Sequence, residues 1–268
     1  MIRIPITMCH GLTEPGCQAE FPLTANHFDQ LIRIAHDMGF TSINYDELDT
    51  WRNKVGSLPE RPIMFDFDHP AKSMRHGVHD ILERYGYSGN LFINTGWFDP
   101  DGDNYAGCMT WDEVRELVDL GWHIGAHTVT HPNLSELAAK DPDGEKLHWE
   151  LETCDTTLVE QLGIVPKDFA FTGTSWSSEA EKQVSARYRF GRFWIIGSHY
   201  RADGEDVRLA DLLGVEGEDK ADGGPPMASR YITGESHPHR LPSIEIQRDL
   251  IYRPEAFRAY LEGALANS

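Results

Sequence analysis

The chain has 268 residues, of which 40% are hydrophobic and 25% are charged, and this composition excludes a disordered or collagen-like protein. Its 43 acidic and 24 basic side chains leave a formal net charge of −19, which disfavours nucleic acid and anionic membranes as partners because both would be repelled. No stretch reaches the roughly 18 apolar residues of a membrane span, so no membrane partner is expected.

Strand-like and helix-like apolar patterns alternate from the first residues nearly to the last. The start, residues 1–9, lacks the apolar core and the cleavage site of a signal peptide and instead predicts a first strand at 4–9. Further strands are expected, in chain order, at residues 42–44, 61–67, 91–94, 122–126, 169–171, 193–196 and 244–246. Amphipathic helices are expected between them at residues 28–38, 78–84, 111–120 and 147–162.

This alternation of about eight strands with helices predicts a parallel α/β architecture. No G-x-G-x-x-G turn follows an early strand, which disfavours a dinucleotide-binding fold, and a closed barrel is preferred. Barrels of about 250 residues fold as one unit, so we expect a single domain over residues 1–268. Residues 203–236, rich in Gly, Asp and Pro, are expected to form a long excursion over the barrel mouth.

The spacing of the cysteines indicates in which cellular compartment the protein is located. Cys9, Cys17, Cys108 and Cys154 stand far apart with no C-x-x-C pair, which fits neither a disulfide framework nor a zinc knuckle. Reduced thiols, together with the lack of a signal peptide, predict a cytoplasmic protein.

The sharpest local signal is the segment His127-Thr-Val-Thr-His131, directly after the strand expected at 122–126. Two imidazoles four positions apart can converge on one ion, and α/β barrels place their sites at the carboxyl ends of the strands. The alternative is a pair of surface histidines in a polar loop. Their position at a strand end favours a metal site.

A second polar cluster, Asp66-Phe-Asp68-His69, ends the strand expected at 61–67. Burying two carboxylates and an imidazole is costly unless they are paired or bind a cation. The alternative is a strand end that reaches solvent. Together the two clusters could supply a three-ligand metal site with open positions beside a carboxylate base, which is the minimum for metal-assisted hydrolysis.

With these residues the chain resembles the polysaccharide deacetylases that share the NodB homology domain, known as carbohydrate esterase family 4. The family motif H-[ST]-x-x-H is intact at His127–His131, and residues 109–121 are similar to the helix that precedes it. Met8-Cys-His10-Gly is similar to the M-Y-H segment that opens one branch of the family. The resemblance implies a distorted (β/α) barrel of about seven to eight mainly parallel strands, and removal of an acetyl group from an N-acylated sugar or polysaccharide.

The family's first motif, T-F-D-D-G, is altered in this chain. An ungapped alignment places Asp68 on the general base and His69 on the second Asp, a metal ligand, so the resemblance implies an ion held by His69, His127 and His131. Three imidazoles with open positions suit zinc, and nickel or cobalt would also fit. Some relatives write D-x-D here, and on that register Asp66 is the base and Asp68 a ligand.

The family's third motif is altered as well. Ala170 stands in place of the Arg that often holds the base, and Thr172 in place of a Pro. A backbone N–H near Gly173 or Thr174 could still serve as the oxyanion donor, because backbone donors need no particular side chain.

The late L-x-H motif that commonly supplies the general acid is absent. His237 is therefore predicted to protonate the leaving amine, with His239 as its alternative, because both stand just before the final strand. His199 is a weaker candidate. His10 and Trp97 both end strands, so each either lines the site or has a structural role, Trp97 by stacking on a sugar ring or by packing.

The predicted function is a metal-dependent hydrolase of an N-acylated carbohydrate, with Asp68 as base. One alternative is a hydrolase of the same fold that acts on a small linear or cyclic amide, which the cytoplasmic prediction and the altered third motif favour. The other is a carbohydrate-binding protein that has lost turnover. Loss of the Arg and of the late His supports this last reading, and the intact histidine pair opposes it.

Overall fold

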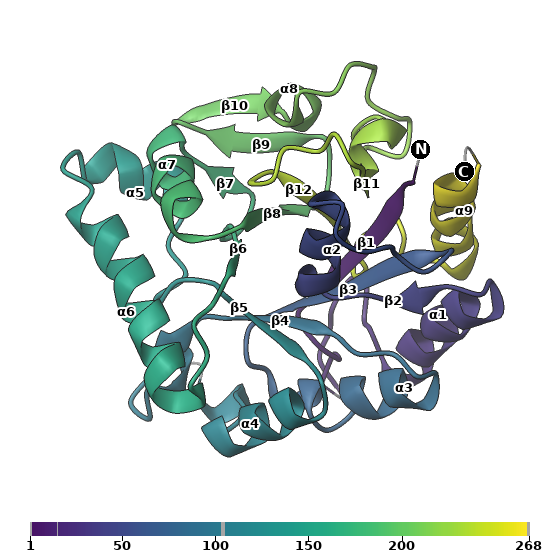
Figure 1. Ribbon diagram of the computed structural model, residues 1–268, viewed down its shortest axis with the longest axis horizontal. Coiled ribbons are helices and arrows are strands. Elements are labelled where there is room, and N and C mark those ends of the chain that lie inside the picture. Colours follow the sequence, from purple (N-terminus) through teal and green to yellow (C-terminus); the bar gives the residue numbers. More distant parts are fainter. Residues whose placement is uncertain (1, 15, 103–104, 267–268) are drawn as a thin grey trace.

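A computed structural model of the chain describes residues 2–14, 16–102 and 105–266. Seven strands of this part close into a parallel barrel, in the order β1, β12, β8, β6, β5, β4, β3 and back to β1 (Figure 1). Their bounds are β1 Ile4–Cys9, β3 Pro62–Asp68, β4 Asn90–Ile93, β5 His123–Ala126, β6 Asp168–Ala170, β8 Phe190–Ile195 and β12 Leu241–Glu245. The predicted distorted (β/α) barrel is confirmed.

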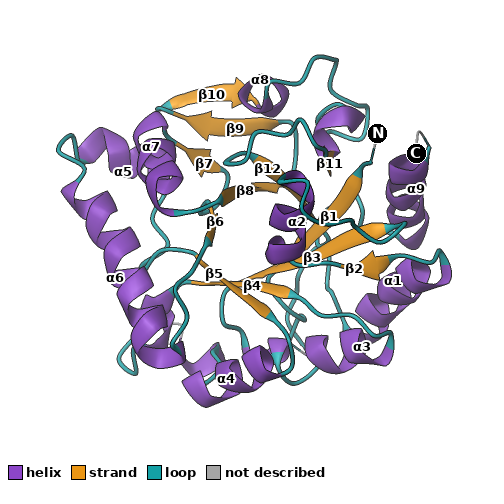
Figure 2. Cartoon of the chain, viewed as in Figure 1, coloured by secondary structure: helices purple, strands orange, loops and turns teal. Residues whose placement is uncertain are grey.

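Helices surround the barrel on the outside, as Figure 2 shows. They are α1 Ala25–Asp37, α3 Val78–Arg84, α4 Trp111–Asp119, α5 Leu134–Lys140, α6 Glu145–Leu162, α7 Ser178–Arg187, α8 Leu209–Leu213 and α9 Pro254–Leu265. Short 3₁₀ turns lie at η1 Lys72–Met74, η2 Thr95–Phe98, η3 Tyr105–Gly107 and η4 Met227–Arg230. None of the helices in the described ranges is both long and apolar enough to cross a membrane.

The sequence sets the ends of the outer helices by capping. Thr24 accepts a hydrogen bond from the backbone N–H of His27 at the start of α1, and Thr110 and Glu113 form a reciprocal capping box at the start of α4. The buried residues of α1 recur every three or four positions and face the barrel. Local sequence and packing therefore agree on where these helices lie.

A separate apolar core fills the inside of the barrel. Helix α2 (Tyr45–Arg52) closes its amino-terminal end, and Tyr45 stacks there on His123 and contacts Phe190, the first residues of β5 and β8. Figure 2 shows α2 in front of the barrel opening. Since α2 fills the amino-terminal end, the open end of the barrel is the one at the carboxyl ends of the strands. Polar side chains that follow these strands meet there.

Residues 203–236 do not cover the mouth, so that prediction was wrong. β10 (Glu205–Arg208) pairs with β9 (His199–Ala202), which pairs with β7 (Ser175–Trp176) in a small second sheet. β11 (Tyr231–Ile232) pairs with the first residues of β1, and the Arg230 carbonyl accepts a hydrogen bond from Tyr260 of α9. The segment thus runs outside the barrel from the carboxyl end of β8 toward the amino end of β1.

Candidate metal centre

Three imidazoles meet at the carboxyl ends of two strands. His69 directly follows β3 and His127 directly follows β5, while His131 lies one turn further along the chain. One ring nitrogen of each lies within 4.8 Å of the other two, and His69 and His127 are buried. Nitrogens that share one zinc ion lie about 2 Å from it, so the cluster has nearly the size of a three-ligand site. The structure brings the three predicted ligands together.

Hydrogen bonds fix which nitrogen of each buried ring faces the centre. Nδ1 of His69 donates to Oδ1 of Asn94 over 2.9 Å, and Nδ1 of His127 donates to the carbonyl of Ala170 over 2.8 Å. A carbonyl oxygen only accepts, so Nε2 of each ring is left as the acceptor. Nε2 of His127 is buried without a hydrogen-bond partner in the described part of the chain. Such an orphaned acceptor is what a metal ion would satisfy.

The environment keeps these imidazoles neutral. Burial lowers the pKa of His127 to about 3 and holds the pKa of His69 well below its usual range. Burial also lowers the pKa of His131. Neutral imidazole is the form that binds metals, so the cluster can bind an ion at neutral pH.

The backbone around the cluster is strained. His69, Thr128 and His131 have φ angles of 68°, 70° and 60°, in the left-handed region that non-glycine residues rarely adopt. The hydroxyl of Thr128 accepts a hydrogen bond from the N–H of His131 over 3.1 Å and so supports the turn. Strain of this kind persists only where surrounding contacts hold it, and it gathers at functional sites.

Asp68 lies beside the imidazoles and is held by an arginine. Its Oδ2 is 3.8 Å from Nε2 of His127, and its two oxygens accept hydrogen bonds from the guanidinium of Arg192, on β8. Both side chains are buried. Burial raises the pKa of Asp68, but Arg192, aided by His127, more than offsets this and holds the pKa well below its usual range. Asp68 is therefore ionised and available as a base.

Asp66 lies deeper in the barrel, away from the imidazoles. Its carboxylate accepts hydrogen bonds from Tyr45 over 2.7 Å and Asn90 over 3.0 Å, and it is 3.3 Å from Nε of Arg192. Burial raises its pKa to about 6. These contacts tie Asp66 to the helix that closes the barrel, which favours the register with Asp68 beside the ion over the D-x-D alternative.

Sequence reasoning missed Arg192. Ala170 in the third motif predicts the loss of an arginine that holds the base, but Ala170 and Arg192 are register partners on the adjacent parallel strands β6 and β8. Both side chains therefore lie at the same level of the barrel. The available signal was a charged residue directly before the strand expected at 193–196, within the run Phe190-Gly-Arg-Phe-Trp-Ile, where burial requires a partner of opposite charge.

His10 completes the wall of the site. It follows β1, its ring stacks on His69 with centroids 4.9 Å apart, and its Nδ1 lies 3.4 Å from Oε2 of Glu245 at the end of β12. Burial lowers the pKa of His10, but the Glu245 carboxylate outweighs it and the net pKa is raised. Trp97 also stacks on His69, with centroids 4.1 Å apart. Trp97 thus packs against one ring of the imidazole cluster.

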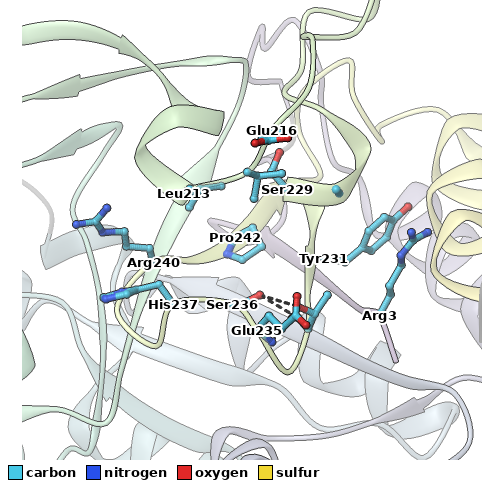
Figure 3. A pocket seen from close by; sticks show the side chains of 14 residues that line it. Arg3, Leu213, Glu216, Ser229, Tyr231, Glu235, Ser236, His237, Arg240 and Pro242 are labelled. Atoms are coloured by element: carbon cyan, nitrogen blue, oxygen red, sulfur yellow. Dashed lines mark hydrogen bonds between the residues drawn. The ribbon is translucent and has the colours of Figure 1, made fainter. Parts of the chain in front are cut away.

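The prediction for His237 as general acid was wrong. His237 precedes β12, so it lies at the amino-terminal end of the barrel, where it lines a cavity of about 390 Å³ with Arg3 and Pro242 (Figure 3). His239 is at the same end, and its Nε2 donates to the carbonyl of Tyr188, ahead of β8. Residues before and after a strand lie at opposite ends of a parallel barrel, and the excursion returns to the closed end.

The remaining candidates lie at the rim of the site or outside it. His199 is exposed on β9 and is 3.0 Å from Asp206. The segment that carries the predicted oxyanion donors follows β6, and the Thr172 hydroxyl donates to the carbonyl of Pro132, next to His131. The third-motif segment therefore borders the imidazole cluster even though its side chains differ from the family pattern.

Comparisons with known proteins agree with the fold. A family model described as polysaccharide deacetylase matches residues 56–190, just over half of the chain. YxkH of Bacillus subtilis (strain 168), whose name places it among polysaccharide deacetylases, is 20% identical over 143 residues, which cover 53% of this chain and 48% of YxkH. The chain thus spans about half the length of that relative.

Two solved structures share the barrel over nearly all of both chains. The Streptococcus pyogenes deacetylase PplD in complex with acetate has a TM-score of 0.70 at 18% identity, covering 97% of this chain and 98% of PplD. IcaB from Ammonifex degensii has a TM-score of 0.66 at 13% identity and covers 98% of each. These likenesses show the fold, and the family model decides the membership: the chain belongs to the polysaccharide deacetylase family.

Proposed function

We propose that this protein is a metal-dependent hydrolase that removes an acetyl group from an N-acetylated sugar of a polysaccharide. The observation that carries the proposal is the buried, orphaned Nε2 of His127 in a three-imidazole cluster beside an ionised Asp68. Membership of the deacetylase family supports the reaction type. Reduced cysteines remain the basis for the predicted cytoplasmic location, and in the described residues none of the four cysteines forms a disulfide.

His69, His127 and His131 would hold the ion, and a set of three neutral imidazoles suits zinc. When bound, the ion supplies positive charge that polarises the amide carbonyl and lowers the pKa of water. Asp68 accepts the proton of the attacking water, and Arg192 keeps Asp68 ionised and oriented for this step. A backbone N–H near Gly173 remains the proposed donor to the oxyanion.

We assign the general acid to His10 in place of His237. His10 lies against His69 and is paired with Glu245, and its side chain is one-third exposed, so a leaving group can reach it. A carboxylate behind an imidazole orients the ring and stabilises its protonated form, which is the arrangement that proton donation to an amine requires. Asp68 and His10 then supply the base and the acid on two sides of one cluster.

A cavity of about 280 Å³ adjoins His10 and supports a carbohydrate substrate. Its lining joins aromatic and polar side chains, among them Phe21, Trp194, Gln247 and Arg248. Aromatic faces beside hydrogen-bonding groups suit a sugar ring better than a small apolar amide. The departing amine remains on the sugar, so a sugar held here is close to the acid that protonates it.

The test compares acetate release from N-acetylglucosamine oligomers with ammonia or amine release from small linear amides and with ring opening of small cyclic amides. We expect acetate release from the oligomers, its loss after treatment with a chelator, and no turnover of the small amides. Turnover of the small amides alone would contradict the proposed substrate. A protein that binds the oligomers tightly and releases no acetate would support the binding-protein alternative. One argument for that alternative, the loss of the arginine that holds the base, no longer applies because Arg192 binds Asp68.

A further inference from the structure

Helix α6 carries a carboxylate on its buried face. Glu150 is only 5% exposed and lies among the apolar side chains Leu147, Leu151 and Cys154, which face the barrel. In the described residues no Lys or Arg pairs with it; its partners are groups of the loop after β5. Burying a carboxylate without a basic partner lowers the free energy of unfolding, and an apolar residue at this position would avoid that loss of stability.

The partners of Glu150 all belong to the segment between two of the proposed metal ligands. Its Oε2 accepts hydrogen bonds from the backbone N–H of Val129 over 2.8 Å and of Thr130 over 2.9 Å. Its Oε1 accepts a hydrogen bond from the hydroxyl of Thr130. One side chain thus binds two successive residues of the three that separate His127 from His131.

This segment needs external support. Thr128 and His131 both adopt left-handed backbone conformations that disfavour side chains with a Cβ, and both lie at the ends of the stretch that Glu150 binds. A carboxylate that accepts two adjacent N–H groups fixes their directions more firmly than a neutral acceptor does. Without it the N–H of the buried Val129 would be left unpaired.

We infer that Glu150 is a positioning residue that holds the His127–His131 loop in the one conformation in which both imidazoles reach the same ion. The inference rests on the proposed function, since it concerns the same metal site. It goes beyond that function because it holds that a buried carboxylate of α6, which touches neither ion nor substrate, fixes the positions of the two imidazoles.

The experiment measures the Zn²⁺ dissociation constant by competition with a chromogenic chelator for wild type and four variants. Glu150→Ala should weaken Zn²⁺ binding about 10–100-fold, the usual effect of losing a group that orients a ligand. Glu150→Gln should stay within about threefold, because its amide oxygen accepts both N–H groups and its amide N–H can donate to the Thr130 hydroxyl. Thr130→Val, which removes one of the three hydrogen bonds, should fall between them.

The matched control is Glu152→Ala on the same helix. Glu152 is exposed and pairs with Arg187, so its loss should leave Zn²⁺ affinity unchanged. A second readout is the visible absorption of the Co²⁺-saturated protein, which reports ligand geometry and should change in Glu150→Ala but not in Glu152→Ala. This signal does not follow from a mere loss of folding stability.

Wild-type Zn²⁺ affinity and an unchanged Co²⁺ spectrum in both Glu150→Ala and Thr130→Val would overturn the inference, even if both variants unfold more easily. If Glu150→Ala does not fold, Thr130→Val alone decides. A wild-type protein that binds no Zn²⁺ would instead overturn the proposed function itself, so the two failures are distinguishable.

Discussion

Arg192 is the residue on which the charge balance inside the barrel depends. It is fully buried and lies between the carboxylates of Asp66 and Asp68, with its guanidinium 4.9 Å from the ring centre of Phe92. Removing one partner of a buried ion pair leaves the other charge uncompensated, which typically costs about 3–5 kcal/mol. Arg192→Met should lower the free energy of unfolding by about this amount in a urea titration. An unchanged midpoint and slope would show that the pair contributes nothing to stability.

Asp68 and Asp66 differ in role although they are two residues apart. Asp68→Asn should lower kcat by about 10²–10⁴-fold, the usual contribution of a general base, and leave the metal content intact. Asp66→Asn is the matched control and should retain both metal and most of the activity, since Asp66 contacts Tyr45 and Asn90 and not the imidazoles. Metal loss in Asp68→Asn would instead support the D-x-D register, with Asp66 as base.

His10 and His237 offer a comparison between two imidazoles at opposite ends of the barrel. His10→Ala should lower kcat by about 10²-fold or more and leave Zn²⁺ affinity within a few-fold, because it removes a proton donor and not a ligand. His237→Ala should behave like wild type, since His237 lies at the closed end. Equal activity in wild type and His10→Ala would remove His10 from the proposed mechanism.

The register between neighbouring strands determines which positions can supply the same side chain to the site. Ala170 on β6 and Arg192 on β8 are aligned, so we expect an arginine at either position to reach Asp68. In the double variant Ala170→Arg, Arg192→Ala, we expect part of the stability and activity lost in Arg192→Ala to return. Urea unfolding and acetate release check this. A double variant that is no better than Arg192→Ala would show that only β8 offers a fitting path for the side chain.

The strand pattern of the sequence was sufficient to predict the three imidazoles but not their neighbours. His69, His127 and His131 stand immediately after strands or one turn later, and position at a strand end is visible in an apolar pattern. The partner of Asp68 was not visible, because which strands are neighbours depends on barrel closure and not on order in the chain. The stacking of His10 on His69 likewise depends on β1 lying beside β3.

At the scale of the whole molecule, the barrel has one closed and one open end. Helix α2 fills the amino-terminal end, and the ligand cluster lies at the other. Strand and helix patterns predicted the barrel, but the path of residues 203–236 has no periodic signal and was misplaced. The general acid was misassigned for the same reason, because His237 follows that segment and lies where the segment ends, at the closed end.

We propose that deacetylation depends on one ion held by the three imidazoles. The most direct measurement adds Zn²⁺ in steps to metal-free protein and follows acetate release from N-acetylglucosamine oligomers. We expect a linear rise in rate that stops at one equivalent of Zn²⁺ per chain, and no rise in His127→Ala, which lacks the orphaned Nε2. Full activity of the metal-free protein, or an equal response of His127→Ala to Zn²⁺, would show that deacetylation does not depend on this ion.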